Sequence, residues 1–372
     1  MDAYKERRER VAAKLRAEGS GAALFEDAEG RRDLSIRYLS GHPDGALLMI
    51  AADGRSRLVA WDINLARLMG KADEILAYSE FERQPIRALA ETIKAWGLPA
   101  GARVELPSTT AYPRYVDFVE ALPGCDLVCR DGGIGAEVDA MRAVKDGAEI
   151  ALYRKAAAIT DSLVDAIEAA VRGGRASTET DVALLIEREC RAAGCEGTGF
   201  DTIAAGPTRS FGIHAFPPYG AGAFGSPGMS ILDFGLKVEG YTTDVTMTFL
   251  RGGLGPERER MVELVLEARK AALGGIKPGA RTRDVAQAVD AVFKAGGHVM
   301  PHALGHGIGL EAHESPAIRS RADNEDLFAE GQVVAIEPGL YHPELGGVRF
   351  EDDVLVTAAG CEVLTHSRIV RL

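Results

Sequence analysis

Two segments in the C-terminal part of the chain are typical of β-hairpins that carry acidic residues. In the first, β-prone apolar runs flank a turn at Lys237–Gly240. If Val238 and Glu239 are the two loop residues, Asp233 lies directly opposite Asp244. Directly opposed side chains of an antiparallel pair have Cβ atoms about 4.5–5.5 Å apart. Two carboxylates at that separation repel each other unless a positive charge lies between them.

The second hairpin repeats this arrangement. Strands expected at 333–341 and 347–356 place Glu337 and Glu351 across the sheet from each other. Four carboxylates that converge from two hairpins are costly to bury without compensating charge. Two divalent cations carry four positive charges, which balance the four carboxylates. The acid pairs therefore predict a dinuclear metal site, in which the ions lie about 3.5–4 Å apart.

A cluster of histidines offers further chemistry. The chain has only eight histidines, and three of them fall in one short segment: His302, His306 and His313. Alternating glycines run through that segment: Gly305, Gly307 and Gly309. They allow the backbone to approach a ligand closely. One imidazole can complete an oxygen-rich metal site, while the others serve proton transfer or polarise a carbonyl group.

The elements that would position these residues form an internal repeat. Thr180–Ala183 begins a helical run, and Arg283–Ala286 begins a similar run 103 residues later. Ile231–Leu236, which carries the first acid of its hairpin, has a counterpart 104 residues later at Ala335–Leu340. Nearly constant offsets predict a duplicated helix-plus-hairpin unit with a pseudo-twofold axis. Each half would then supply one acidic hairpin to a shared centre.

The first third of the chain predicts a separate α/β unit. A charged amphipathic segment, Tyr4–Glu18, precedes strand-like apolar runs, and Asp53–Gly54 between two such runs indicates a hairpin. No ionisable residues there have a spacing suited to chemistry, so we expect a scaffold, a cleft wall or a subunit interface. The sequence changes character near Gly132–Gly133, before a long Ala-rich helical pattern. We therefore place the domains at residues 1–135 and 136–372.

Composition narrows the class of protein. The 372 residues are 46% hydrophobic and 26% charged, which is typical of an ordinary globular chain of two domains. A net charge of −12 without a Lys/Arg block argues against nucleic acid and anionic membranes as partners. No apolar segment approaches the roughly 18–20 residues of a membrane span, and the N-terminus is too charged for a secretory signal, so we expect a cytoplasmic protein. Five cysteines without a CxxC pair argue against a disulfide framework or a structural zinc site.

The motifs resemble those of the pita-bread metallopeptidases, the family that includes methionine aminopeptidase, aminopeptidase P and prolidase. The resemblance rests on the Asp pair eleven residues apart, His306 in its Gly-rich segment, Glu337 in Ile336–Gly339 and Glu351 in Arg349–Asp353. It covers roughly residues 138–372, and the preceding stretch is similar to the creatinase/prolidase N-terminal domain. The Arg349–Asp353 motif resembles that of the proline-directed members.

The resemblance implies a fold, a ligand set and several catalytic residues. The fold class is α+β, with a pita-bread catalytic domain of duplicated helix–hairpin units that follows a smaller α/β domain. The implied metal ligands are Asp233, Asp244, His306, Glu337 and Glu351. The implied catalytic residues are His214, His302, His313, Glu337 and Arg349. Of these, Glu337 would also carry a proton to the leaving nitrogen, while Arg349 would orient a ligand carboxylate or bind a substrate carboxylate.

By resemblance, the chain is a dinuclear metal-dependent peptidase that hydrolyses Xaa-Pro bonds of dipeptides or short peptides through a hydroxide bridging two ions. The ligand set favours Mn²⁺ over Co²⁺ or Zn²⁺. The alternative is an aminopeptidase P that acts on longer peptides, and a cation for the free carboxylate of a dipeptide, at Arg319 or Arg349, would separate the two. Two further alternatives stay open: a catalytically idle binding module of the same fold, and an enzyme that cleaves a related bond in a non-peptide substrate. The expected partner is a proline-containing peptide, and the resemblance implies a homodimer.

Overall fold

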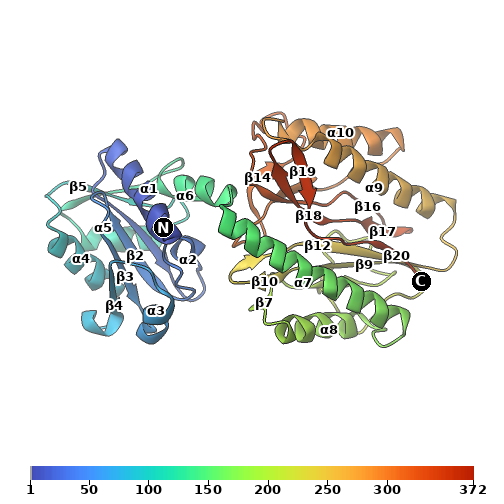
Figure 1. Ribbon diagram of the computed structural model, residues 1–372, viewed down its shortest axis with the longest axis horizontal. Coiled ribbons are helices and arrows are strands. Elements are labelled where there is room, and N and C mark those ends of the chain that lie inside the picture. Colours follow the sequence, from blue (N-terminus) through green and yellow to red (C-terminus); the bar gives the residue numbers. More distant parts are fainter. Residues whose placement is uncertain (1) are drawn as a thin grey trace. The chain divides into compact units, whose positions relative to one another are not determined.

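The computed structural model describes residues 2–372, and the chain forms two compact units (Figure 1). The first unit ends at Arg142, and the second is Ala143–Leu372. The boundary that we predicted after residue 135 lies inside helix α6 (Ile134–Ala143). Gly132, with a φ of 70°, turns the chain into this helix. The change of composition there marks the start of α6, and the two units separate near the end of that helix.

The first unit is built on a six-stranded sheet with the strand order β4-β3-β2-β1-β5-β6. The strands are β1 (Ala22–Asp27), β2 (Ala46–Ala51), β3 (Ser56–Ala60), β4 (Glu74–Ala77), β5 (Ala102–Leu106) and β6 (Cys125–Cys129). The helices are α1 (Ala3–Glu18), α2 (Leu34–Ser40), α3 (Ile63–Met69), α4 (Pro85–Trp96), α5 (Tyr112–Ala121) and α6, with a short 3₁₀ helix at Tyr78–Phe81.

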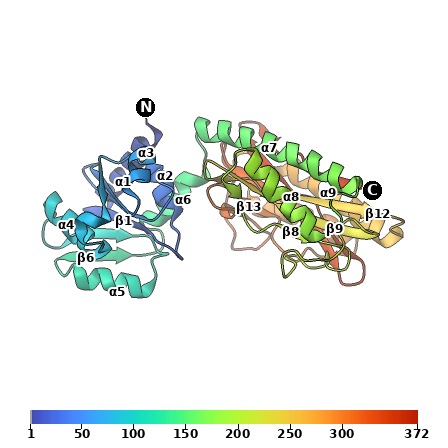
Figure 2. The ribbon, with the colours of Figure 1, turned by 90° about the horizontal axis from the view of Figure 1, so that it is seen from below.

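The arrangement of this unit confirms the predicted α/β class. Strands β2 and β3 form the hairpin expected at Asp53–Gly54: Ile50 pairs with Ser56, and Gly54 adopts a φ of 97°. Helices α1 and α2 pack on β1 and β2 from one face of the sheet, and α4 and α5 cover the other face (Figure 2). The core of the unit therefore lies on both faces of its sheet.

The second unit contains the acidic hairpins and four long helices. The helices are α7 (Gly147–Arg172), α8 (Glu179–Ala192), α9 (Pro256–Gly275) and α10 (Thr282–Ala295). The strands of its first half are β7 (Gly197–Thr198), β8 (Ile203–Ala205), β9 (Gly228–Phe234), β10 (Leu236–Val238), β11 (Tyr241–Thr242) and β12 (Val245–Arg251). Those that follow are β13 (Gly305–Gly307), β14 (Glu314–Ile318), β15 (Val333–Ile336), β16 (Gly339–His342), β17 (Gly346–Arg349), β18 (Asp352–Thr357), β19 (Gly360–Val363) and β20 (Ile369–Arg371).

The predicted duplication is present in this unit. Helices α8 and α10 are each 14 residues long, and α10 begins 103 residues after α8, the offset seen in the sequence. Helices α7 and α8 share a hydrophobic core with β9 and β12, in a sheet of order β20-β12-β9-β8. Helices α9 and α10 share another core with β15 and β18, in a sheet of order β14-β13-β15-β18-β19. Each half thus supports its sheet with a pair of helices.

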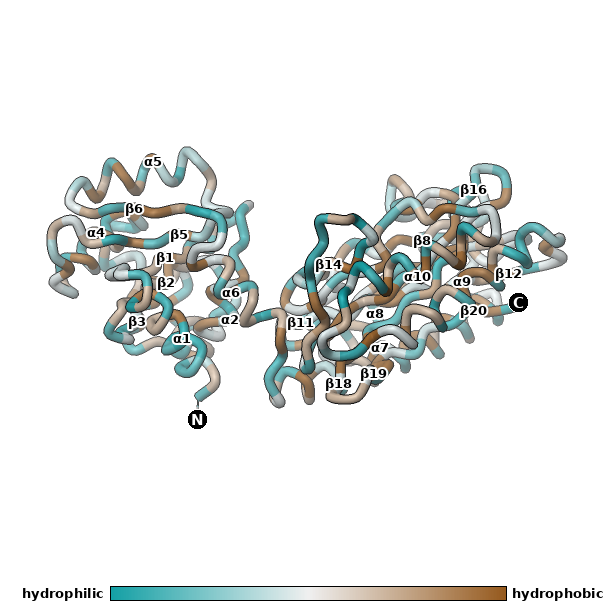
Figure 3. The backbone as a smooth tube through the Cα atoms, turned by 90° about the horizontal axis from the view of Figure 1, so that it is seen from above, coloured by the Kyte–Doolittle hydropathy of each residue, from teal (hydrophilic) through white to brown (hydrophobic). Residues whose placement is uncertain are grey.

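Local sequence signals explain where the long helix α7 begins. The Asp146 side chain accepts hydrogen bonds from the backbone N–H groups of Ala148 and Glu149, and Glu149 accepts from the N–H of Asp146. Such a capping box stabilises a helix by about 1 kcal/mol. Figure 3 shows hydrophobic and hydrophilic positions alternating along the helices, as expected for helices with one buried face. No helix within residues 2–372 combines the length and apolarity that a membrane span requires.

Candidate metal centre

The register of the first acidic hairpin differs from our prediction. We expected Asp233 opposite Asp244, and this pairing is wrong, because Asp233 lies opposite Thr246. The same register continues along the hairpin, so its loop residues are Glu239 and Gly240, with φ values of 49° and 91°. A type I′ turn requires positive φ at both of its loop residues, and a glycine meets this requirement without steric strain. Asp244 is therefore diagonal to Asp233 and on the same face of the hairpin.

The second acidic hairpin has the predicted register. The β15–β18 and β16–β17 pairings share one register, which sets Glu337 opposite Glu351. A bridge then joins the two hairpins, since the backbone N–H of Glu351 donates to the Thr246 carbonyl at 3.3 Å and the Thr246 N–H donates back at 3.4 Å. Four residues consequently form one row across the two hairpins: Asp233, Thr246, Glu351 and Glu337. Side chains in one such row lie on the same face of the sheet.

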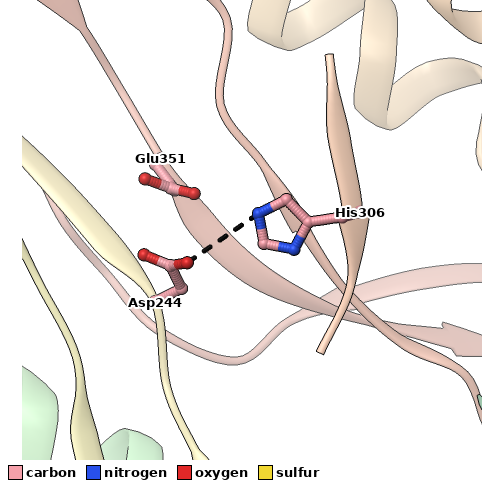
Figure 4. Close-up of side chains that lie close together, drawn as sticks. All are labelled: Asp244, His306 and Glu351. Atoms are coloured by element: carbon pink, nitrogen blue, oxygen red, sulfur yellow. Dashed lines mark ion pairs between the residues drawn. The ribbon is translucent and has the colours of Figure 1, made fainter. Parts of the chain in front are cut away.

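The predicted histidine ligand reaches this face from β13. His306 lies opposite Ala335 of β15, two residues before Glu337 and hence on its face. Its Nε2 atom is 3.8 Å from Oδ2 of Asp244 and 3.8 Å from Oε1 of Glu337. Asp244, His306 and Glu351 each offer a ligand atom within 4.8 Å of the other two (Figure 4). The five predicted ligands therefore belong to one sheet face, and they come from both halves of the duplicated unit.

Arg349 is the buried counter-charge of this acidic group. Its Nη2 donates to Oδ2 of Asp233 at 2.5 Å, and its Nε donates to the Thr246 hydroxyl at 2.9 Å. Its Nη1 donates to the Tyr341 hydroxyl at 2.9 Å and to the Ile213 carbonyl at 3.0 Å. The side chain is 1% exposed, and each guanidinium nitrogen is engaged within the protein. Of the two roles that the sequence left open, these contacts support orientation of Asp233.

The other predicted histidines lie around the same centre. His302 places Nδ1 3.8 Å from Oε2 of Glu337 and Nε2 3.1 Å from the Tyr341 hydroxyl. The His313 ring lies 4.1 Å from the His306 ring, between centroids. His214 is exposed on the segment between β8 and β9, and its charge contributes to lowering the pKa of His313, after the larger effect of burial. The structure thus gathers all three histidines near the acids.

Burial makes the uncompensated acids unfavourable in their charged form. It raises the pKa of Asp244 and Glu351 well above the usual range, and it raises that of Glu337 to about 7. The pKa of Asp233 is also raised by burial, although Arg349 opposes the shift. Burial lowers the pKa of His306 to about 4, so its imidazole is neutral and suited to bind a metal ion at neutral pH.

The donor atoms fit divalent ions. One buried carboxylate oxygen, Oδ1 of Asp233, has no hydrogen-bond partner, which is a costly arrangement for an anion in the interior. Ligand atoms at about 2.0–2.2 Å from a common ion can lie up to about 4.4 Å apart, which accommodates the 3.8 Å separations around His306. Four carboxylates and one neutral imidazole form a hard, oxygen-rich set of the kind that Mn²⁺ prefers.

Removal of divalent ions should make the stability of the chain depend on pH. Because the pKa of Glu337 is raised to about 7, this carboxyl favours the folded state only while it is protonated. Its contribution is fully present below the unfolded pKa of about 4.3 and is lost as the pH rises through about 7. The buried Asp244 and Glu351 act in the same direction. The metal-free chain should therefore melt at a lower temperature at pH 8 than at pH 5.5.

Thermal unfolding with and without chelator at the two pH values checks this expectation. Added Mn²⁺ should raise the melting temperature more at pH 8, where a smaller share of these carboxyl groups is protonated, than at pH 5.5. An equal rise at both pH values would contradict the assignment of these acids to one uncompensated cluster.

Three residues of the centre were missed by the sequence analysis. Thr246 donates its hydroxyl hydrogen to Oε2 of Glu351 at 2.6 Å, and Tyr341 accepts from Arg349. The carboxylate of Asp353 accepts from the backbone N–H of Asp244 at 3.1 Å. Period-two alternation from Asp244 and from Glu351 could have identified Thr246 and Asp353 as residues on the same face. The same alternation from Glu337 reaches Tyr341, and its partner Arg349 lies only eight residues away.

The chain is similar to several proteins over nearly its whole length. The YkvY protein of Bacillus subtilis, which carries a provisional dipeptidase name, is 32% identical over 362 residues, covering 96% of this chain and 97% of that protein. The structure of an X-Pro aminopeptidase from Thermotoga maritima matches with a TM-score of 0.86 at 28% identity, covering 98% of this chain and 99% of that one. A Xaa-Pro dipeptidase from Bacillus anthracis matches with a TM-score of 0.86 at 26% identity, covering 99% and 100%.

The similarity extends to archaeal structures and to the family as a whole. A prolidase from Pyrococcus furiosus matches with a TM-score of 0.81 at 26% identity, covering 96% of this chain and 99% of that one. These matches confirm the predicted fold class, including the α/β unit that precedes the duplicated one. The family model described as metallopeptidase family M24 matches residues 151–358, which is more than half of the chain. The chain therefore belongs to metallopeptidase family M24.

Proposed function

We propose that this chain is a dinuclear Xaa-Pro dipeptidase. The observation that carries the proposal is the convergence of five donor side chains on one sheet face with too little positive charge to balance them. The proposed ligands of the two divalent ions, for which Mn²⁺ is our choice, are Asp233, Asp244, His306, Glu337 and Glu351. When bound, such ions polarise a carbonyl group and lower the pKa of water to near neutrality.

The residues around the ions would transfer protons, contact the substrate and orient the metal ligands. Glu337, which lies 3.8 Å from both His302 and His306, would hold a proton and pass it to the leaving nitrogen. His302 lies 3.8 Å from Oε2 of Glu337 and keeps a neutral ring, because burial lowers its pKa to about 4. His313 and His214 are exposed and are positioned to contact the substrate carbonyl or carboxylate. Arg349 keeps Asp233 in place.

The names of the relatives support the proposed substrate class. The names of the Bacillus anthracis and Pyrococcus furiosus proteins, a Xaa-Pro dipeptidase and a prolidase, support cleavage before proline in dipeptides. The Thermotoga maritima protein, an X-Pro aminopeptidase with the same TM-score as the dipeptidase, favours the second candidate, an enzyme for longer peptides. Since Arg349 is engaged internally, the exposed Arg319 is the remaining arginine that we predicted for a dipeptide carboxylate.

Comparison of two substrates tests the proposal. With added Mn²⁺, kcat/KM for an Ala-Pro dipeptide should exceed that for a pentapeptide beginning Ala-Pro by about tenfold or more, which is about 1.4 kcal/mol of discrimination. A preference for the pentapeptide would show instead that the chain is an Xaa-Pro aminopeptidase. If neither peptide is cleaved and metal analysis finds no divalent ion in protein purified without chelator, the chain is an idle member of its family.

A further inference from the structure

Lys145 is a buried cation that the proposed reaction does not use. It lies between α6 and α7, and its backbone N–H donates to the carbonyl of Gly331 at 2.9 Å. Its side chain is fully buried, and its Nζ atom lies 3.5 Å from Oε2 of Glu314, which is also buried. Lysine is almost never fully buried without an anionic partner, because removing the ammonium from water is costly. The pair therefore holds both side chains in fixed positions.

Glu314 connects this lysine to the segment that carries His313. It directly follows His313, and its Oε1 atom accepts a hydrogen bond from the backbone N–H of Glu311 at 3.2 Å. The carboxylate also presses against Gly309, where an added Cβ atom would lie 2.2 Å from Oε2. Only a glycine leaves room for that approach. The conformation of the segment from Gly309 to Glu314 therefore depends on where the Glu314 carboxylate is held.

A second connection runs from the lysine to Asp244. The carbonyl of Gly309 accepts from the backbone N–H of Thr242 at 2.9 Å, two residues before Asp244. The backbone N–H of Asp244 itself donates to Oδ2 of Asp353 at 3.1 Å. The Lys145–Glu314 pair is thus linked through Gly309 to the backbone two residues before Asp244.

We propose that Lys145 is a positioning residue for the metal centre. Through Glu314, and through the contact of Glu314 with Gly309, it fixes the backbone that carries His313 and Asp244. It touches neither the substrate nor an ion, so it acts only through other groups. The inference rests on the proposed function, because it takes Asp244 to be a metal ligand. Lys145 would thus be a buried counter-charge outside the ligand set that determines how well the ligands are oriented.

Variants of the lysine test the inference. Lys145→Met removes the charge and keeps most of the length of the side chain, whereas Lys145→Arg keeps the charge. Arg269→Met is the matched control, because Arg269 pairs with Asp352 at 2.6 Å on the opposite face of β18. In Lys145→Met, the affinity for Mn²⁺ and kcat should each fall by about 10–100-fold, while KM for Ala-Pro changes by less than about threefold. Lys145→Arg should recover most of both losses, and Arg269→Met should show neither.

Hydrogen exchange of residues 309–316 in chelated protein adds a measurement that needs neither ions nor turnover. Exchange should be faster in Lys145→Met than in the wild type and should return toward wild-type rates in Lys145→Arg. If the wild type binds no Mn²⁺, the proposed function fails, and the exchange rates alone decide whether Lys145 holds this segment. Unchanged exchange in Lys145→Met, or an Arg variant no better than the Met variant when both are folded, would overturn the proposal.

Glu314→Gln covers the case in which Lys145→Met does not fold. This variant keeps the shape of the side chain and removes the negative charge from the pair. It should reproduce the faster exchange of residues 309–316 and the weaker Mn²⁺ binding. Wild-type exchange and wild-type Mn²⁺ affinity in Glu314→Gln would refute the role that we assign to the pair.

Discussion

Replacement of Asp244 by alanine should abolish peptidase activity and raise the stability of the metal-free chain. Asp244 lies within 4.8 Å of ligand atoms of His306 and Glu351, so its loss removes a donor at the point where both hairpins meet. Loss of the several kcal/mol that a bound ion contributes to a transition state corresponds to a fall in kcat of about 10³-fold or more. The same substitution removes one of the mutually repelling buried carboxylates, whose pKa burial raises well above normal.

The two effects of Asp244→Ala have opposite signs, which separates lost chemistry from lost folding. Mn²⁺ titration calorimetry, kcat on Ala-Pro and thermal unfolding with chelator measure them on one sample. Asp201→Ala, which removes an exposed carboxylate, is the control and should change none of the three. Undiminished activity in Asp244→Ala would refute its assignment as a ligand, and a lower melting temperature in chelator would refute the repulsion argument.

Replacement of Arg349 by methionine should destabilise the chain strongly. The guanidinium is the buried partner of Asp233 and also donates to Thr246, Tyr341 and Ile213. Breaking a buried ion pair by removing one partner costs about 3–5 kcal/mol, because the other charge stays buried and unpaired. Denaturant unfolding in chelator should show this loss, and bound Mn²⁺ should reduce it by supplying a positive charge to Asp233.

Arg349→Lys distinguishes the charge from the shape of the side chain. A lysine preserves the positive charge but cannot reach four acceptors with a planar fork. It should therefore recover part of the stability lost in Arg349→Met, while kcat stays low because Asp233 is no longer held in one orientation. Equal stability of Arg349→Met and the wild type in chelator would show that Asp233 is protonated and needs no partner.

The residue types of the centre could be predicted from the sequence, but their contacts could not. Repeated offsets near 103 residues identified the duplicated unit, because helices α8 and α10 carry the same pattern of apolar positions. The opposition of Glu337 and Glu351 followed from the strand bounds that we expected for the second hairpin. The pairing of Asp233 was wrong by two residues, since the sequence did not show which pair between Lys237 and Gly240 would form the turn.

The role of Arg349 shows more clearly which contacts could not be predicted from the sequence. Two roles were equally compatible with its place two residues before Glu351. The choice depends on contacts with Ile213 and with Thr246, more than 100 positions away in the sequence. Such contacts are set by the packing of the two halves against each other, and neither hydrophobic period nor residue spacing carries that information.

The backbone bridge between Thr246 and Glu351 joins the two halves of the duplicated unit at the metal centre. Each half alone brings two carboxylates, and the imidazole belongs to the second half only. A solitary half would thus lack the donors for a pair of ions, and catalysis would emerge only from the joined whole. Bound ions would in turn cross-link the two halves. Local unfolding of either half would therefore release the ions and abolish catalysis.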